Sequence, residues 1–92
     1  MDATGPINVL VVDDSAVQRI ALAHLLEEDP AIRVRAAVAD GLAALDYVRH
    51  RRPDVVLMDV HMPGMDGFET TRRIMETHAL PIVICSATLA AD

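Results

Sequence analysis

Three aspartates stand directly after apolar runs of this chain, at positions where buried strands would end. Asp13 and Asp14 follow the run Ile7–Val12, and Asp59 follows the Val-Val-Leu-Met run at 55–58. Runs rich in valine, isoleucine and leucine predict strands that are buried on both faces of a parallel sheet. Because ligands of open α/β sheets bind at the carboxyl ends of the strands, the three carboxylates are expected to meet at that edge.

A divalent cation would stabilise such a cluster of acids. Carboxylates held close together repel one another unless a positive charge lies between them. Mg²⁺, or Mn²⁺ in its place, prefers oxygen ligands, so Asp14, Asp59 and, partly through water, Asp13 are predicted to bind the ion. The backbone carbonyl of His61 can complete the coordination, because Mg²⁺ also accepts carbonyl oxygen.

The same residues suggest phosphoryl chemistry. Asp59 is the predicted nucleophile, whose carboxylate attacks a phosphoryl group and becomes an acyl phosphate. The predicted metal ion would stabilise charge on the transferring oxygens. Ser86 ends the next apolar run, and its hydroxyl can form a hydrogen bond with a phosphoryl oxygen. The alternative interpretation is a set of unrelated turn and helix-cap residues, since aspartate caps helices well.

The composition limits the class of protein. The 92 residues, 52% of them hydrophobic, suit one small domain with a core. The net charge of −6 argues against nonspecific binding of nucleic acid or of an anionic membrane. Cys85 is the single cysteine, so an intrachain disulfide is impossible and a reducing compartment is expected. The N-terminus has no signal-peptide pattern and no apolar stretch reaches the roughly 18–20 residues that span a bilayer, so a cytoplasmic location is expected.

The periodicity of the apolar residues predicts alternating strands and helices. Strands are predicted at 7–12, 33–39, 54–58 and 82–85, and helices at 16–28, 41–50 and 67–77. Ser15 and Asp40 are the predicted caps of the first two helices. This alternation implies an α/β fold, with a parallel sheet and right-handed crossovers, in one domain over residues 1–92.

Each predicted helix is expected to bury one apolar stripe against the sheet. In the first helix the predicted buried residues are Val17, Ile20, Ala21, His24 and Leu25. In the second helix they are Leu42, Leu45 and Val48, and in the third they are Phe68, Thr71, Ile74 and Met75. Gly64 and Gly67, in the loop before the third helix, are attributed to backbone requirements, since glycine tolerates positive φ.

Three segments together resemble a known family. They are Val11-Val12-Asp13-Asp14-Ser15, Leu57-Met58-Asp59-Val60-His61-Met62-Pro63-Gly64-Met65-Asp66-Gly67, and Pro81-Ile82-Val83-Ile84-Cys85-Ser86-Ala87. This combination is similar to the receiver domain of two-component response regulators. The resemblance implies a flavodoxin-like, doubly wound sheet with strand order 2-1-3-4. It also implies phosphorylation of Asp59 by a histidine kinase or a histidine phosphotransfer protein. Together with Arg72-Arg73-Ile74-Met75, the same segments resemble the N-terminal receiver of chemotaxis protein-glutamate methylesterases.

The chain departs from the family pattern after its fourth predicted strand. Receivers normally have a fifth strand followed by a lysine near the phosphoryl group, whereas this chain stops at Asp92 and all eight of its basic residues are arginine. The resemblance therefore implies a receiver that is incomplete at its C-terminus, without the fifth strand, the last helices and the lysine. An exposed edge on the fourth strand would favour a homodimer or a pair of chains that exchange elements.

Three functions remain open on the sequence alone. The first is a signalling receiver that accepts a phosphoryl group on Asp59. The second is the regulatory N-terminal part of a methylesterase; no Gly-x-Ser-x-Gly nucleophile elbow occurs here, so these residues would not perform the hydrolysis themselves. The third is a degenerate binding module that docks a kinase or another receiver without being phosphorylated.

Overall fold

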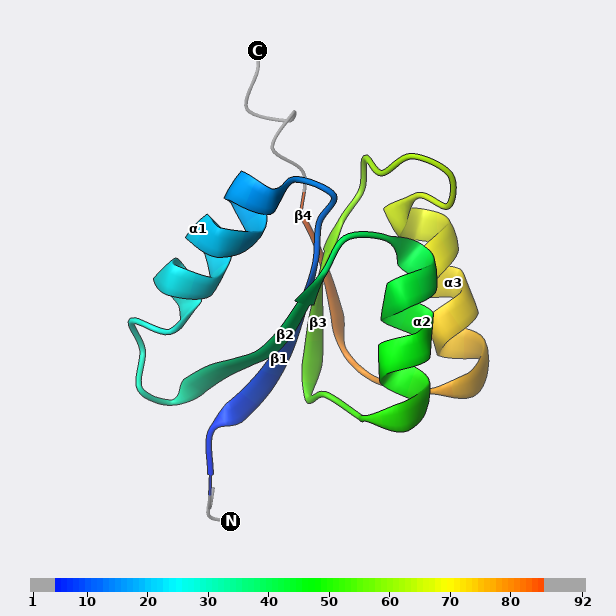
Figure 1. Ribbon diagram of the computed structural model, residues 1–92. Helices are drawn as coiled ribbons and strands as arrows, with labels where there is room; N and C mark the ends of the chain where they lie inside the picture. Colours follow the sequence, from blue (N-terminus) through cyan, green and yellow to red (C-terminus); the bar gives the residue numbers. More distant parts are fainter. Residues whose placement is uncertain (1–4, 86–92) are drawn as a thin grey trace.

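The polypeptide forms a parallel sheet with helices on both faces (Figure 1). The computed structural model describes residues 5–85. In chain order the elements are β1 (Ile7–Val12), α1 (Ala16–Leu26), β2 (Ile32–Val38), α2 (Gly41–His50), β3 (Val55–Asp59), α3 (Gly67–Thr77) and β4 (Ile82–Cys85). The strands lie in the order β2-β1-β3-β4, and each neighbouring pair is parallel. The predicted doubly wound α/β fold with strand order 2-1-3-4 is therefore confirmed.

The register of the strands brings the ends of β1 and β3 to the same edge of the sheet. Val12 pairs with Met58, so Asp13 and Asp59 are the next residues along two neighbouring strands. On the other side of β3, Asp59 pairs with Cys85 of β4. The carboxyl ends of the strands and the loops that follow them therefore form one continuous edge, as expected for a parallel sheet.

Each helix begins with a polar cap. The Oγ of Ser15 accepts a hydrogen bond from the backbone N–H of Gln18 at 3.2 Å, which confirms Ser15 as the cap of α1. Asp40 caps α2 and Asp66 caps α3 through equivalent bonds of 2.8 and 2.9 Å. Because Ser15 supplies the cap of α1, the two preceding aspartates are not needed for that purpose.

The main core lies between the sheet and the helices α2 and α3. Its buried residues are Leu10, Val12, Ala44, Val48, Val56, Met58, Met62, Ile74 and Leu80. The register of β2 shifts beside Val9 and Leu10, as at a β-bulge. This shift allows the strand to turn Ile32 toward the α1 side of the sheet, while Ala36 packs against the core on the other side.

Helix α1 covers the opposite face with a different side from the one predicted. Val17 is 77% exposed, and Ile20 and Leu25 are each 63% exposed. Ala21 and His24, the other members of the predicted stripe, are also exposed. The half-buried residues of α1 are instead Gln18, Arg19, Leu22, Ala23 and Leu26. The prediction was wrong because α1 carries apolar residues on both sides, and periodicity does not show which side faces the sheet.

Helices α2 and α3 also differ from their predicted faces. Ile74 and Val48 are buried and Leu45 is half-buried, as predicted. However, the structure exposes Leu42, Phe68 and Met75, and in their place it buries Gly41, Ala44, Gly67 and Thr70. The two helices pack so closely that a Cβ added at Gly41 would clash with the hydroxyl of Thr70. Small residues allow this approach, whereas Leu42, Phe68 and Met75 lie outside the contact and are exposed.

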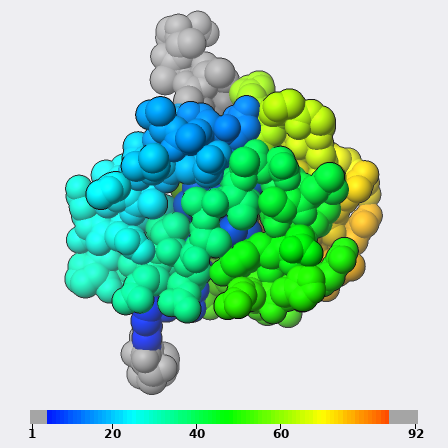
Figure 2. Space-filling model, viewed as in Figure 1, coloured from blue at the N-terminus to red at the C-terminus, as the bar shows by residue number. Residues whose placement is uncertain are grey.

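Beside α1, part of the sheet face is left open as an apolar hollow of about 350 Å³. It is lined by Ile7, Val9, Leu26, Ile32, Val55, Leu57 and Val83. In the space-filling view α1 and α2 lie on opposite sides of the molecule, and β1 is visible in the seam between them (Figure 2). None of the helices within residues 5–85 is both long and apolar enough to cross a membrane.

Candidate functional site

The three aspartates meet at the carboxyl edge of the sheet, as the sequence predicted. Asp13, Asp14 and Asp59 each offer a carboxylate oxygen within 4.8 Å of the others. Asp13 is buried, Asp59 is half-buried and Asp14 is exposed. The site is therefore open to solvent on the side of Asp14 and closed on the side of Asp13.

Asp13 is held at the end of β1 by hydrogen bonds to its neighbours. Its backbone N–H donates to the carbonyl of Val38 on β2 at 3.0 Å. Its Oδ1 accepts from the backbone N–H of Ser15 at 2.9 Å. Its carbonyl oxygen accepts from Nη1 of Arg19 on α1 at 2.8 Å. These contacts join β1, β2 and α1 at one residue and restrict the positions that its carboxylate can take.

Asp59 is the last residue of β3, and the start of α3 packs directly against it. The N–H of Gly67 donates to the carbonyl of Val60 at 2.9 Å, and a Cβ added at Gly67 would clash with the backbone of Asp59. Gly67 is thus required for this close approach, whereas the predicted positive φ occurs at Gly64, where φ is +76°. The attribution of Gly67 to positive φ was wrong, because the constraint there comes from tertiary packing.

The electrostatic environment raises the pKa of Asp59 above its ordinary value. The largest cause is burial of the carboxylate, followed by the negative charge of Asp13 and, more weakly, that of Asp14. A hydrogen bond from the backbone of His61 and the nearby imidazole of that residue act in the opposite direction. The site therefore disfavours its own negative charge when metal is absent, which is the chemistry expected of a cation-binding pocket.

Cys85 lies opposite Asp59 on β4 and is half-buried. Burial raises the pKa of its thiol, and the negative charges of Asp59 and Asp13 raise it further. The thiol is therefore neutral at physiological pH, and Cys85 is a small, half-buried residue of the strand.

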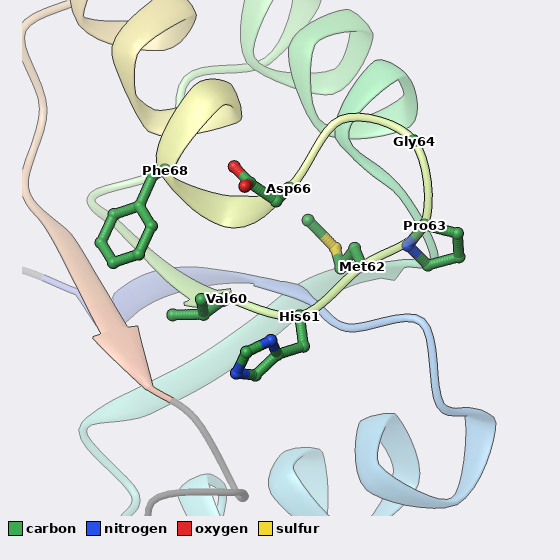
Figure 3. Close-up of a pocket in the computed structure, with 7 residues that line it drawn as sticks. All are labelled: Val60, His61, Met62, Pro63, Gly64, Asp66 and Phe68. Atoms are coloured by element: carbon green, nitrogen blue, oxygen red, sulfur yellow. The ribbon is translucent and has the colours of Figure 1, made fainter.

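The loop after β3 forms a second, more open hollow of about 640 Å³. It is lined by Val60, His61, Met62, Pro63, Gly64, Asp66 and Phe68 (Figure 3). Phe68, at the start of α3, lines this hollow and is 62% exposed. Since Val60 and His61 directly follow Asp59, this hollow adjoins the acidic site.

The predicted roles of Ser86 and of the His61 carbonyl stay predictions. Ser86 lies outside the described residues. The backbone and the imidazole of His61 both oppose the rise in the pKa of Asp59, and the predicted use of the His61 carbonyl as a metal ligand stays a prediction. Sequence reasoning missed the contact of Arg19 with Asp13. The signal in the sequence is an arginine one turn into the helix that follows the two acids.

Nearly the whole chain is similar to known proteins. The family model described as the response regulator receiver domain matches residues 9–92. A protein-glutamate methylesterase/protein-glutamine glutaminase of Geobacter metallireducens is 51% identical over 86 residues, which are 94% of this chain and 25% of that protein. The corresponding protein of Nitrosospira multiformis is 54% identical over 80 residues, or 87% of this chain and 22% of that protein. The chain thus spans about a quarter of the length of these curated relatives.

Solved structures show the same architecture. The response regulator domain of Thermotoga maritima CheB superposes with a TM-score of 0.85 at 35% identity, covering 89% of this chain and 61% of that one. A LuxR-family response regulator from Aurantimonas sp. also gives a TM-score of 0.85, at 34% identity, covering 89% of this chain and 59% of that one.

Proposed function

Because the chain belongs to the response regulator receiver family, we propose that it accepts a phosphoryl group on Asp59 in a Mg²⁺-dependent reaction. The proposed donor is the phosphohistidine of a histidine kinase or of a histidine phosphotransfer protein. The observation that carries the proposal is the position of Asp59, at the end of β3 with two further carboxylates within 4.8 Å. Residues 1–92 are proposed to act as a single receiver unit, in the cytoplasm.

The donor set of the site fits Mg²⁺ or Mn²⁺. Three carboxylate oxygens are hard ligands, and burial together with the negative charges of Asp13 and Asp14 raises the pKa of Asp59, so a bound cation would favour the charged carboxylates. We propose that Asp13, Asp14, Asp59 and the carbonyl of His61 hold the ion. When bound, the ion would neutralise the acids and stabilise charge on the phosphoryl oxygens.

The chemistry assigned to Asp59 is nucleophilic. One carboxylate oxygen attacks the phosphorus of the donor, so that a P–O bond forms while the P–N bond of the phosphohistidine breaks. The bonding electron pair stays with the imidazole nitrogen of the donor. Asp13 and Asp14 keep their carboxylates on the same side as the attacking oxygen, and Ser86 is proposed to form a hydrogen bond with a phosphoryl oxygen.

The proposal is tested with a small phosphodonor. The 92-residue chain is incubated with acetyl phosphate and Mg²⁺, and the intact mass is measured. We expect the mass of one added phosphoryl group in the wild-type chain and none in Asp59→Asn or in the presence of EDTA. An unmodified wild-type chain, under conditions that modify an intact receiver, would contradict the proposal. A chain that binds a kinase without this mass increase would support the degenerate binding module instead.

A second candidate function is the regulatory part of a chemotaxis methylesterase. The identities of 51% and 54% to protein-glutamate methylesterases favour it over other receiver contexts. The hydrolase activity would belong to residues other than these 92. The nucleotide sequence that follows the codon of Asp92 tests this candidate, because it either continues into a hydrolase domain with a nucleophile elbow or does not.

We further propose that two copies of the chain associate through the open face beside α1 and the edge of β4. The hollow there is lined by apolar residues, and Val83 is 51% exposed on β4. Light scattering after size-exclusion chromatography should report a dimer for the wild type and a monomer for Val83→Lys. Leu42→Lys, at an exposed site on α2, is the control and should remain dimeric. A monomeric wild type would exclude this association.

A further inference from the structure

Both the backbone and the side chain of Arg19 connect α1 to the turn that carries Asp13 and Asp14, here called the acidic turn. Its backbone N–H donates to the carbonyl of Ser15 at 2.9 Å, as the first turn of the helix requires. Its guanidinium reaches back in the same direction, and Nη1 donates to the carbonyl oxygen of Asp13 at 2.8 Å. Arg19 is half-buried and belongs to the side of α1 that faces the sheet. A charged residue on this side therefore has a specific partner, and that partner is a backbone atom of the acidic site.

The atom that Arg19 holds determines the geometry of two carboxylates. The carbonyl of Asp13 belongs to the peptide unit that also contains the N–H of Asp14, and a peptide unit is planar. Holding this carbonyl therefore restricts the rotation that orients Asp13 and the rotation that orients Asp14. The other bonds of Asp13, to Val38 and Ser15, involve its N–H and its side chain and leave its carbonyl to Arg19.

The remaining arginines have other positions. Arg33 and Arg35 are exposed on the edge strand β2, and Arg49, Arg51 and Arg52 lie at the end of α2. Arg72 and Arg73 form ion pairs with glutamates of α3. Arg19 is thus the arginine that the hydrogen bonds of the described residues place on the acidic turn.

We propose that Arg19 is a positioning residue for metal binding, which orients Asp13 and Asp14 through the peptide unit between them. The inference rests on the proposed metal site. It assigns to Arg19 a role through geometry and not through charge, since a cation beside the site would by itself oppose the binding of a metal ion. The two effects have opposite signs, and this difference makes the proposal testable.

The test measures the affinity for Mn²⁺ by the loss of the free-ion signal in electron paramagnetic resonance. Arg19→Met removes the guanidinium and keeps the apolar stem and the helix propensity. We expect its dissociation constant for Mn²⁺ to rise about tenfold, as for other residues that orient metal ligands. Arg19→Lys retains a donor and should recover part of the affinity. Arg33→Met removes the same charge from an exposed position and should bind Mn²⁺ like the wild type.

Each result has a defined meaning. Circular dichroism first shows that every variant is folded at the temperature of the titration, and Arg19→Gln replaces Arg19→Met if methionine prevents folding. Unchanged or tighter binding of Mn²⁺ by the folded neutral variant would overturn the proposal. A purely structural role would lower the melting temperature and leave the dissociation constant unchanged. Absence of Mn²⁺ binding by the wild type would instead refute the proposed metal site.

Discussion

Replacing Asp59 by asparagine should stabilise the metal-free chain. The substitution keeps the size of the side chain and its ability to accept the hydrogen bond from His61, but it removes one of three clustered negative charges. At 4.8 Å, the upper limit of the separations, Coulomb's law gives a repulsion of about 0.9 kcal/mol per pair in water and about 3.5 kcal/mol at an effective dielectric constant of about 20. Since Asp14 is exposed and Asp59 is half-buried, the lower value applies to that pair, whereas for the pair with the buried Asp13 it is a minimum. Removal of the two pairs that involve Asp59 should therefore raise the free energy of unfolding by about 1–2 kcal/mol.

The assay is thermal unfolding at pH 7 in EDTA and in excess Mg²⁺. In EDTA, Asp59→Asn should melt at least about 4 °C above the wild type, because 1 kcal/mol corresponds to about 4–8 °C in a domain of this size. Mg²⁺ at 100 times its dissociation constant should stabilise the wild type by about 2.7 kcal/mol and the variant by less. In excess Mg²⁺ the difference between the two melting temperatures should therefore become smaller, or the wild type should melt above the variant. Glu28→Gln removes an exposed charge beyond the end of α1 and should change neither measurement.

The pH dependence of this difference follows from the sign of the pKa shift. The folded state raises the pKa of Asp59 above 3.8, so the folded chain binds the proton more tightly than the unfolded chain. The charged Asp59 carboxylate therefore lowers the free energy of unfolding by its full amount at pH values above the pKa of the folded chain, and it has no effect below the pKa of the unfolded chain. The advantage of Asp59→Asn should thus decrease as the pH falls through this window. A folded variant that is no more stable than the wild type at pH 7 in EDTA would refute the reasoning.

Three further predictions concern the packing and the surface. Gly67→Ala should lower the free energy of unfolding, measured by urea denaturation, by about 1–3 kcal/mol, because the added Cβ would meet the backbone of Asp59. Gly64→Asn should lower it by less, because asparagine tolerates the φ of +76° at this position. Ile74→Ala should cost about 2–5 kcal/mol because the side chain is fully buried, and Ile20→Ala, at a site that is 63% exposed, should change the same measurement by less than about 0.5 kcal/mol. The pKa of Glu69, lowered to about 2 by hydrogen bonds from Arg72 and Arg73, should be visible in an NMR pH titration. Its contribution to stability is present above the unfolded value of 4.5 and is lost as the pH falls toward 2, and a midpoint near 4.5 would contradict the ion pairs.

Much of the backbone architecture could be predicted because its signals are local. The β-branched runs form the predicted strands, their alternation with helices predicted a parallel sheet, and Ser15 caps α1 as expected. The strand order was predicted from the resemblance to receiver domains. The gathering of Asp13 and Asp59 followed from the same argument, since parallel strands that end in step bring their next residues together. The helix boundaries differed by two residues at most, as at the end of α1, which stops at Leu26.

The buried faces of the helices could not be predicted from periodicity alone. Val17, Ile20 and Phe68 are as apolar as the residues of the core, yet each is more than half exposed. Gly41 and Gly67 have no apolar side chain and so give no periodic signal, yet close packing against Thr70 and the backbone of Asp59 requires glycine at these two helix starts.

The order of the elements, the caps Ser15 and Asp40 and the placement of three acids at strand ends could be predicted, because these features depend on residues that are neighbours along the chain. The tertiary structure decided which side of each helix faces the sheet and how closely α2 and α3 approach each other. It also decided that the carboxylates lie within 4.8 Å and that Arg19 reaches the carbonyl of Asp13. These features depend on how separate elements pack. The volume and orientation of side chains decide this packing, and the segments that meet are far apart in the sequence, so no local pattern predicts their contacts.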